Sequence, residues 1–193
     1  FAEGRAFFEW RHRTRDGRDF PAEVLLSRID LADGAVLQAV VRDVTEQKQA
    51  FDQIRAARNR AQEYFEVARV MMLVLDPQGR VAAINQRGAE LLGLPRSEIV
   101  GRDWFAEFLP ADIREQAQAI FAVLMRGERE AAEYGENPVI TGQGEQRTFA
   151  FRNALLYDNE GRIEGVLSSG MDVTKQRELE DQLAHQASHD PLT

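Results

Sequence analysis

The strongest constraint on the fold is an internal repeat, in which one structural unit and the helix after it occur twice. The matching segments are residues 43–47 (DVTEQ) with 172–176 (DVTKQ), 52–54 with 181–183, 14–20 with 141–147, and Gly34 with Gly161. The first two pairs are 129 residues apart and the last two are 127 apart, so a two-residue insertion separates them. We therefore expect two copies of one unit, the first without its front half.

Each copy ends in a predicted β-hairpin. Residues 149–155 alternate between apolar and other side chains, which is the period of a strand. Residues 158–161 (DNEG) favour a turn, and residues 163–171 form the partner strand. In the first copy, residues 23–31 and 35–42 flank Gly34 in the same way.

A polar helix is expected after each hairpin. Asp43 and Thr45 in the first copy, and Asp172 and Thr174 in the second, supply side-chain oxygens that can cap the start of such a helix. We predict these four residues to form the joints between sheet and helix. The helices should span about residues 45–67 and 174–188, flanking the complete unit.

The apolar stripe of the first helix is thin. It contains only Phe51, Ile54, Ala57, Ala61 and Tyr64 at helical spacing. A helix of this kind is marginal alone, so we expect a partner, which would be the same helix of a second subunit in a homodimer.

The middle of the chain predicts one complete α+β unit. Its expected strands are residues 70–75, 80–84, 133–140, 147–157 and 162–172, and its four helices, ending with 110–126, lie between strands two and three. Asn85 is expected to cap the first of these helices.

The ordered residues of this unit resemble a PAS domain with a closing PAC motif. The resemblance is carried by Asn85, Ala89, Leu92-Gly93, Gly101-Arg102, Trp104-Phe105, Leu109-Pro110 and residues 170–174. It implies a five-stranded antiparallel sheet, with residues 67–174 as the complete domain. It also implies that residues 1–45 are the C-terminal half of a preceding PAS domain, 46–66 a helical linker and 175–188 a signalling helix. On this resemblance we predict that the four joint residues, Asp43, Thr45, Asp172 and Thr174, transmit the signal between sheet and helix.

Residues 189–193 resemble the opening of a GGDEF domain, the catalytic domain of diguanylate cyclases. Ala187, His189, Asp190, Leu192 and Thr193 fit the pattern Ala-x-His-Asp-x-Leu-Thr. The competing resemblance is the phospho-acceptor box of a histidine kinase, but Asp190 and Pro191 depart from that pattern. We interpret the chain as an excerpt of a cyclic-di-GMP signalling protein that has no catalytic site of its own. A phosphodiesterase domain could follow the cyclase.

Ligand chemistry is narrowed by the residues that this unit lacks. The chain has no Cys, which a photoactive flavin adduct requires, and its three His residues lie outside the complete unit. Ala117 stands where haem-binding relatives place an axial His. His-ligated haem, Cys-adduct flavin and a metal site are thus not expected. A non-covalent small molecule, flavin included, or no ligand at all remain open.

The predicted pocket lies between the sheet and the helices. Its candidate residues are Asn153, Ser169, Phe149, Phe151, Leu155, Met171, Phe121 and Trp104. A buried amide such as Asn153 contacts either a ligand or nearby backbone, and Trp104 either stacks on a ligand or packs in the core.

Charge and hydropathy exclude other partners. The formal net charge is −8, which disfavours nucleic-acid binding, and no run of 18 apolar residues is present. We expect a cytoplasmic module without membrane contact, and a membrane anchor elsewhere in the complete protein remains open. Two functions remain: a sensory and dimerisation module that regulates a downstream enzyme, or a ligand-free structural spacer.

Overall fold

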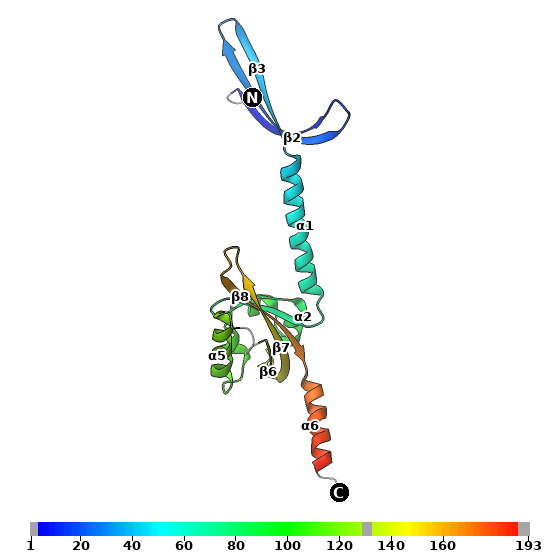
Figure 1. Cartoon of the computed structure of the whole chain (residues 1–193), viewed down its shortest axis with the longest axis vertical. Helices are drawn as coiled ribbons and strands as arrows, with labels where there is room; N and C mark the ends of the chain where they lie inside the picture. Colours follow the sequence, from blue (N-terminus) through cyan, green and yellow to red (C-terminus); the bar gives the residue numbers. More distant parts are fainter. Residues whose placement is uncertain (1–3, 129–132, 189–193) are drawn as a thin grey trace. The chain divides into compact units, whose positions relative to one another are not determined.

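The computed structural model describes residues 4–128 and 133–188. The chain divides into two compact units, residues 1–62 and 63–193, which are considered separately below. Figure 1 shows the elements of both units along the chain.

The first unit is a three-stranded antiparallel sheet in the order β1-β2-β3. Its strands are β1 (Arg5–Arg13), β2 (Asp19–Leu31) and β3 (Gly34–Asp43), and helix α1 (Thr45–Val67) follows directly. The hairpin and helix were expected from the sequence, whereas strand β1 was not. Strand β1 pairs with β2 from Arg5 opposite Ser27 to Arg13 opposite Asp19.

The second unit contains a five-stranded antiparallel sheet in the order β5-β4-β8-β7-β6. The strands are β4 (Met71–Leu75), β5 (Val81–Ile84), β6 (Tyr134–Ile140), β7 (Gln146–Tyr157) and β8 (Ile163–Asp172). This is the predicted α+β arrangement. The first strand along the chain, β4, lies beside the last strand, β8, and the start of β4 pairs with the end of β8, with Met71 opposite Gly170.

Four helices lie between β5 and β6 in the sequence and cover one face of the sheet (Figure 1). They are α2 (Gln86–Leu92), α3 (Arg96–Ile99), α4 (Trp104–Phe108) and α5 (Arg114–Met125). Helix α5 begins later than expected, because residues 110–113 form a turn in which Pro110 accepts a hydrogen bond from the Ile113 amide. Helix α6 (Thr174–Ser188) leaves the end of β8.

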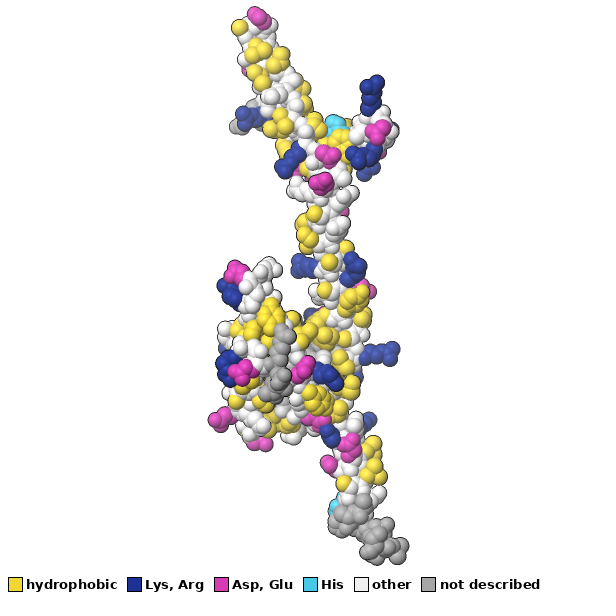
Figure 2. Space-filling model, in the orientation of Figure 1, with side chains coloured by type: hydrophobic (Ala, Val, Ile, Leu, Met, Phe, Trp, Pro, Cys, Tyr) yellow, Lys and Arg dark blue, Asp and Glu magenta, His cyan; other side chains and the backbone are white. Residues whose placement is uncertain are grey.

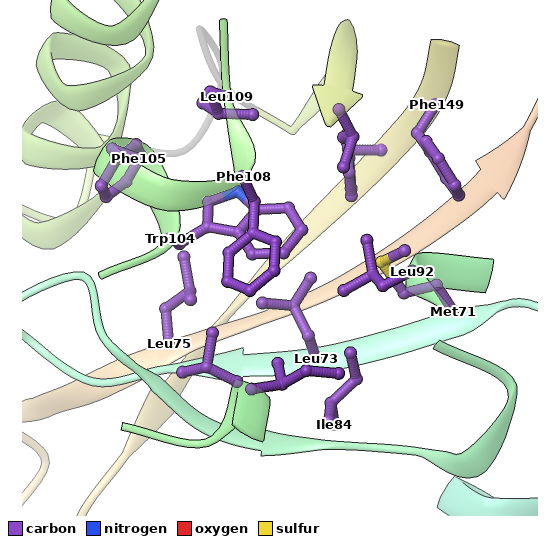
Figure 3. Packing of buried hydrophobic residues seen from close by; sticks show 14 of the residues in the cluster. Met71, Leu73, Leu75, Ile84, Leu92, Trp104, Phe105, Phe108, Leu109 and Phe149 are labelled. Carbon is purple, nitrogen blue, oxygen red and sulfur yellow. The ribbon is translucent and has the colours of Figure 1, made fainter. Parts of the chain in front are cut away.

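The hydrophobic core lies between the sheet and these helices, as Figure 3 shows. Its buried side chains include Met71, Leu73, Leu75, Ile84, Leu92, Trp104, Phe105, Phe108, Leu109 and Phe149. The rings of Trp104 and Phe108 stack with centroids 5.1 Å apart, and Trp104 meets Phe151 edge to face at 6.2 Å. Such pairs add to the free energy that burial itself contributes.

Hydrophobic side chains are exposed along the first sheet and on the linker helices (Figure 2). Helix α1 has no buried residue; Phe51 is 64% exposed and Ile54 69%. On α6, Leu179 and Leu183 are also exposed. Among the described helices, none has the length and hydropathy needed to cross a bilayer.

Candidate functional site

The second unit has a partly open cavity of about 60 Å³ between the sheet and helices α4 and α5. It is lined by Leu73, Leu75, Trp104, Phe105, Leu109, Ala117, Ile120, Phe121, Leu124, Asn137, Phe151, Asn153, Val166 and Ser168. The helices supply apolar and aromatic side chains, and the indole N–H of Trp104 is their only hydrogen-bonding group at the cavity. The two amides and the hydroxyl that line it, those of Asn137, Asn153 and Ser168, come from the strands.

Two of the polar side chains are bonded to each other across strands β7 and β8. Asn153 and Ser168 are opposite one another in the register, and the Ser168 hydroxyl donates to Asn153 Oδ1 at 2.7 Å. Asn137 lines the cavity from β6. None of the described side chains that line the cavity is charged, so the cavity suits a neutral molecule that can form hydrogen bonds.

The first sheet has apolar side chains at the positions that correspond to these polar ones. By the repeat offsets, Leu26 corresponds to Asn153 and Ala39 to Ser168, and these two residues of the first sheet are likewise opposite one another in the register. Trp10 occupies the position that corresponds to Asn137. The strand framework itself therefore does not require polar groups at these three positions.

Four of the predicted pocket residues line this cavity: Phe121, Trp104, Phe151 and Asn153. Phe149 is fully buried in the core but is not part of the cavity wall. Leu155 packs against the cluster of Leu124 and Val166 and, with Asn153, lines a neighbouring hollow. The inward direction predicted for alternate residues of β7 is thus confirmed.

The direction predicted for Ser169 and Met171 is wrong. Both lie on the opposite face of the sheet, where Met171 is 57% exposed, and the inward residues of β8 are Val166, Ser168 and Gly170. The hydrophobic pattern misled because one inward position is glycine: a Cβ on Gly170 would lie 2.7 Å from the Phe151 ring. Ser168 was missed for the same reason, since a one-residue slip reverses every side chain.

The sheet passes into helix α6 through a compact joint. Asp172 Oδ1 accepts hydrogen bonds from the Thr174 amide (3.0 Å) and the Thr174 hydroxyl (2.6 Å). The same hydroxyl oxygen accepts from the Thr148 amide of β7 at 3.0 Å, and Asp172 Oδ2 lies 3.5 Å from an Arg147 nitrogen. This joint connects strands β7 and β8, which carry the cavity, to the first turn of α6.

The first unit repeats the Asp–Thr hydrogen bonds of this joint at its own helix. Asp43 Oδ1 accepts from the Thr45 amide at 2.8 Å and from the Thr45 hydroxyl at 2.6 Å. The hydrogen bond from this hydroxyl lowers the pKa of the Asp43 carboxyl below its ordinary value, because it favours the charged form. The four residues therefore form the expected hydrogen bonds at the two helix starts, and their role in signal transmission stays a prediction.

We expect Asp172→Ala to lower the free energy of unfolding by about 1 kcal/mol, the usual cost of losing a helix cap. The first turn of α6 should fray, because the Thr174 amide loses its acceptor. Urea denaturation and the exchange rate of that amide measure the two effects. An unchanged exchange rate would show that Asp172 does not hold the turn; Asp181→Ala, in the middle of α6, is the matched control.

A second joint holds the helix that enters this unit. Asn85 is fully buried, and its Nδ2 donates to the backbone oxygens of Phe65, near the end of α1, and Val70. Glu66 accepts from the Gln86 amide and pairs with Arg96 at 2.7 Å. Asn85 also caps α2 as predicted, accepting from the Gly88 amide; its contact with the incoming helix was not foreseen.

Comparison with known families identifies the fold. A family model described as PAS fold matches residues 65–178, and a second, described as PAS domain, matches residues 1–46. The chain belongs to the PAS family. No curated protein matches the sequence.

Solved structures agree on the fold. The PAS domain of a Colwellia psychrerythraea protein superposes with a TM-score of 0.54 at 16% identity, covering 62% of this chain and 98% of that one. A PAS domain of an HTR-like protein from Haloarcula marismortui gives 0.51 at 21%, covering 65% and 98%. An RNA-binding Light-Oxygen-Voltage receptor gives 0.55 at 13%, covering 97% of this chain and 83% of that one.

Proposed function

We propose that this chain is a sensory and dimerisation module that passes a signal through helix α6 to a downstream diguanylate cyclase. The observation that carries the proposal is the short path from the cavity to the helix. Ser168 lines the cavity and Asp172 lies four residues further along the same strand, where it holds Thr174 at the start of α6. A change in the cavity wall can therefore reach the helix without crossing another element.

The ligand that fits the cavity is small and uncharged. The volume of about 60 Å³ is far below the roughly 300–1,000 Å³ of pockets that enclose drug-sized molecules. It suffices for a few waters or a molecule of few non-hydrogen atoms. A flavin would require Trp104 and the α5 side chains to move apart, so the small molecule is the favoured occupant.

Native mass spectrometry and the absorbance spectrum of the purified chain test this assignment. A bound neutral species of low mass, lost in Asn153→Leu, supports the sensor. A visible absorbance band would identify a flavin or haem instead. A ligand-free mass, together with full enzyme regulation after deletion of residues 67–174, would favour the structural spacer.

Dimerisation through the linker helices is the second part of the proposal. Ile54 of α1 and Leu183 of α6 occupy matching repeat positions and are 69% and 65% exposed. Helices with such exposed stripes are stabilised by pairing. We expect Ile54→Lys with Leu183→Lys to convert a dimer to a monomer in sedimentation equilibrium, whereas Gln53→Lys with Gln182→Lys should not; a monomeric wild type would contradict pairing.

The downstream cyclase is supported by the resemblance of residues 187–193, most of which lie outside the described residues. The test uses the complete polypeptide that contains this chain, supplied with GTP or with ATP. Formation of cyclic-di-GMP supports the cyclase, and we place the protein in the cytoplasm, where GTP is available. Phosphorylation of a histidine by ATP without turnover of GTP would instead indicate the histidine kinase.

A further inference from the structure

Helix α6 is tied to the sheet by an ion pair separate from the Asp172 joint. Arg177, in the first turn of α6, holds both carboxylate oxygens of Glu136 on β6, with Nε–Oε2 2.8 Å and Nη2–Oε1 2.5 Å. The Tyr134 hydroxyl also donates to Glu136, and Arg177 pairs with Glu180 one turn further along the helix. The guanidinium lowers the pKa of the Glu136 carboxyl, so the carboxylate stays charged.

The first unit contains the corresponding pair. Lys48, in the first turn of α1, lies 2.5 Å from Glu9 of β1. Glu9 is opposite Glu23 in the register, and Glu136 is opposite Ala150, which are equivalent positions at the repeat offset of 127. Lys48 and Arg177 are equivalent at the helix offset of 129. The same acid–base contact is therefore built twice, with lysine in one copy and arginine in the other.

We propose that these two ion pairs are strand-to-helix latches that fix the direction in which each outgoing helix leaves its sheet. We further infer that the Glu136–Arg177 latch is stiffer than the Glu9–Lys48 latch. This inference rests on the proposed function, in which the signal passes through the helices. It adds that the latches control the direction of those helices.

The geometry explains why a latch is needed beside the joint. The Asp172–Thr174 hydrogen bonds hold α6 at its first residue, where it leaves β8. Helix α6 continues from β8, whereas Glu136 lies on β6, with β7 in between. A contact to β6 therefore restrains the helix at a second point away from its origin and sets its angle.

The chemistry of the two bases sets the difference in stiffness. The guanidinium of Arg177 is a planar fork that holds two oxygens at once, which restrains orientation as well as distance. The Lys48 ammonium is a point charge that can rotate about its single contact. Both ion pairs are partly exposed and therefore add little to the free energy of unfolding. Their proposed role is to set the direction of the helix.

Spin-label distance measurements test the proposal, and the absence of Cys from the chain makes site-specific labelling simple. Labels at Asn159→Cys and Gln182→Cys report the second unit, and labels at Asp33→Cys and Gln53→Cys report the first. We expect a narrower distance distribution in the second unit. Glu136→Lys should broaden it, Arg177→Lys should make it resemble that of the first unit, and Lys48→Arg should narrow the first.

The control is Glu128→Lys, which breaks the exposed Arg126–Glu128 pair away from the helix and should leave both distributions unchanged. Circular dichroism verifies that each variant is folded with the same helix content. If Glu136→Lys leaves the second distribution unchanged in a folded protein, the latch does not set helix direction. If Arg177→Lys and Lys48→Arg have no effect, the two latches are equally stiff and the second inference fails.

Discussion

Replacing Asn85 by alanine should lower the free energy of unfolding of the second unit by about 3–5 kcal/mol. The side chain is fully buried and forms four hydrogen bonds with backbone groups. Its Oδ1 accepts from the amides of Met72 (3.0 Å) and Gly88 (2.8 Å), and its Nδ2 donates to the carbonyls of Phe65 (3.1 Å) and Val70 (3.0 Å). Alanine leaves these groups unpaired in the interior.

Urea denaturation of the wild type and the variant measures this loss. Asn85→Asp is the sharper variant, because it keeps the acceptor and the size while turning a negative oxygen toward two carbonyls; we expect it to be at least as unstable as Asn85→Ala. Gln86→Ala, an exposed neighbour, should stay within about 0.5 kcal/mol of the wild type. A loss below about 1 kcal/mol in Asn85→Ala would show that the hydrogen bonds of the Asn85 side chain contribute little to stability.

Trp104→Ala should destabilise the same unit by about 3–5 kcal/mol, the usual cost of deleting a large buried aromatic. Trp104 is only 5% exposed, and its ring contacts Phe108 and Phe151 while forming part of the cavity wall. Its packing role therefore holds whether or not the cavity is occupied.

Thermal and urea unfolding of Trp104→Ala and Trp104→Phe measure how much the packing of this ring contributes to the free energy of unfolding. Trp104→Phe keeps most of the ring and should cost about 1.5 kcal/mol or less. Met171→Ala, on the outer face of the sheet, is the control and should cost under 1 kcal/mol. Wild-type stability in Trp104→Ala would contradict the assignment of this residue to the core.

The repeat made most of the fold predictable. Strand and helix order, the bounds of α1 and the two Asp-x-Thr joints follow from local patterns: alternation, turn residues and caps. Strand β1 was missed because its charged residues interrupt the apolar pattern, and its pairing with β2 is a tertiary contact.

The candidate site was predictable only on one strand. On β7, Phe151 and Asn153 alternate with polar or small residues, so their direction is encoded locally. On β8 the inward position 170 is glycine, because the Phe151 ring of the neighbouring strand leaves no room for a side chain there. This requirement cannot be read from the residues of β8 alone. The contact between Glu136 and Arg177 joins residues 41 positions apart, and no local pattern predicts it.

Hydrogen exchange of the first turn of α6 tests the coupling between cavity and helix most directly. The double variant Asn153→Leu with Ser168→Ala gives the cavity the residue pair that the first sheet carries naturally, Leu26 and Ala39. We expect faster or slower exchange at the Thr174 and Arg177 amides relative to the wild type, as well as changes around the cavity. If exchange changes only in the cavity wall and stays the same in α6, the cavity and the output helix are not coupled.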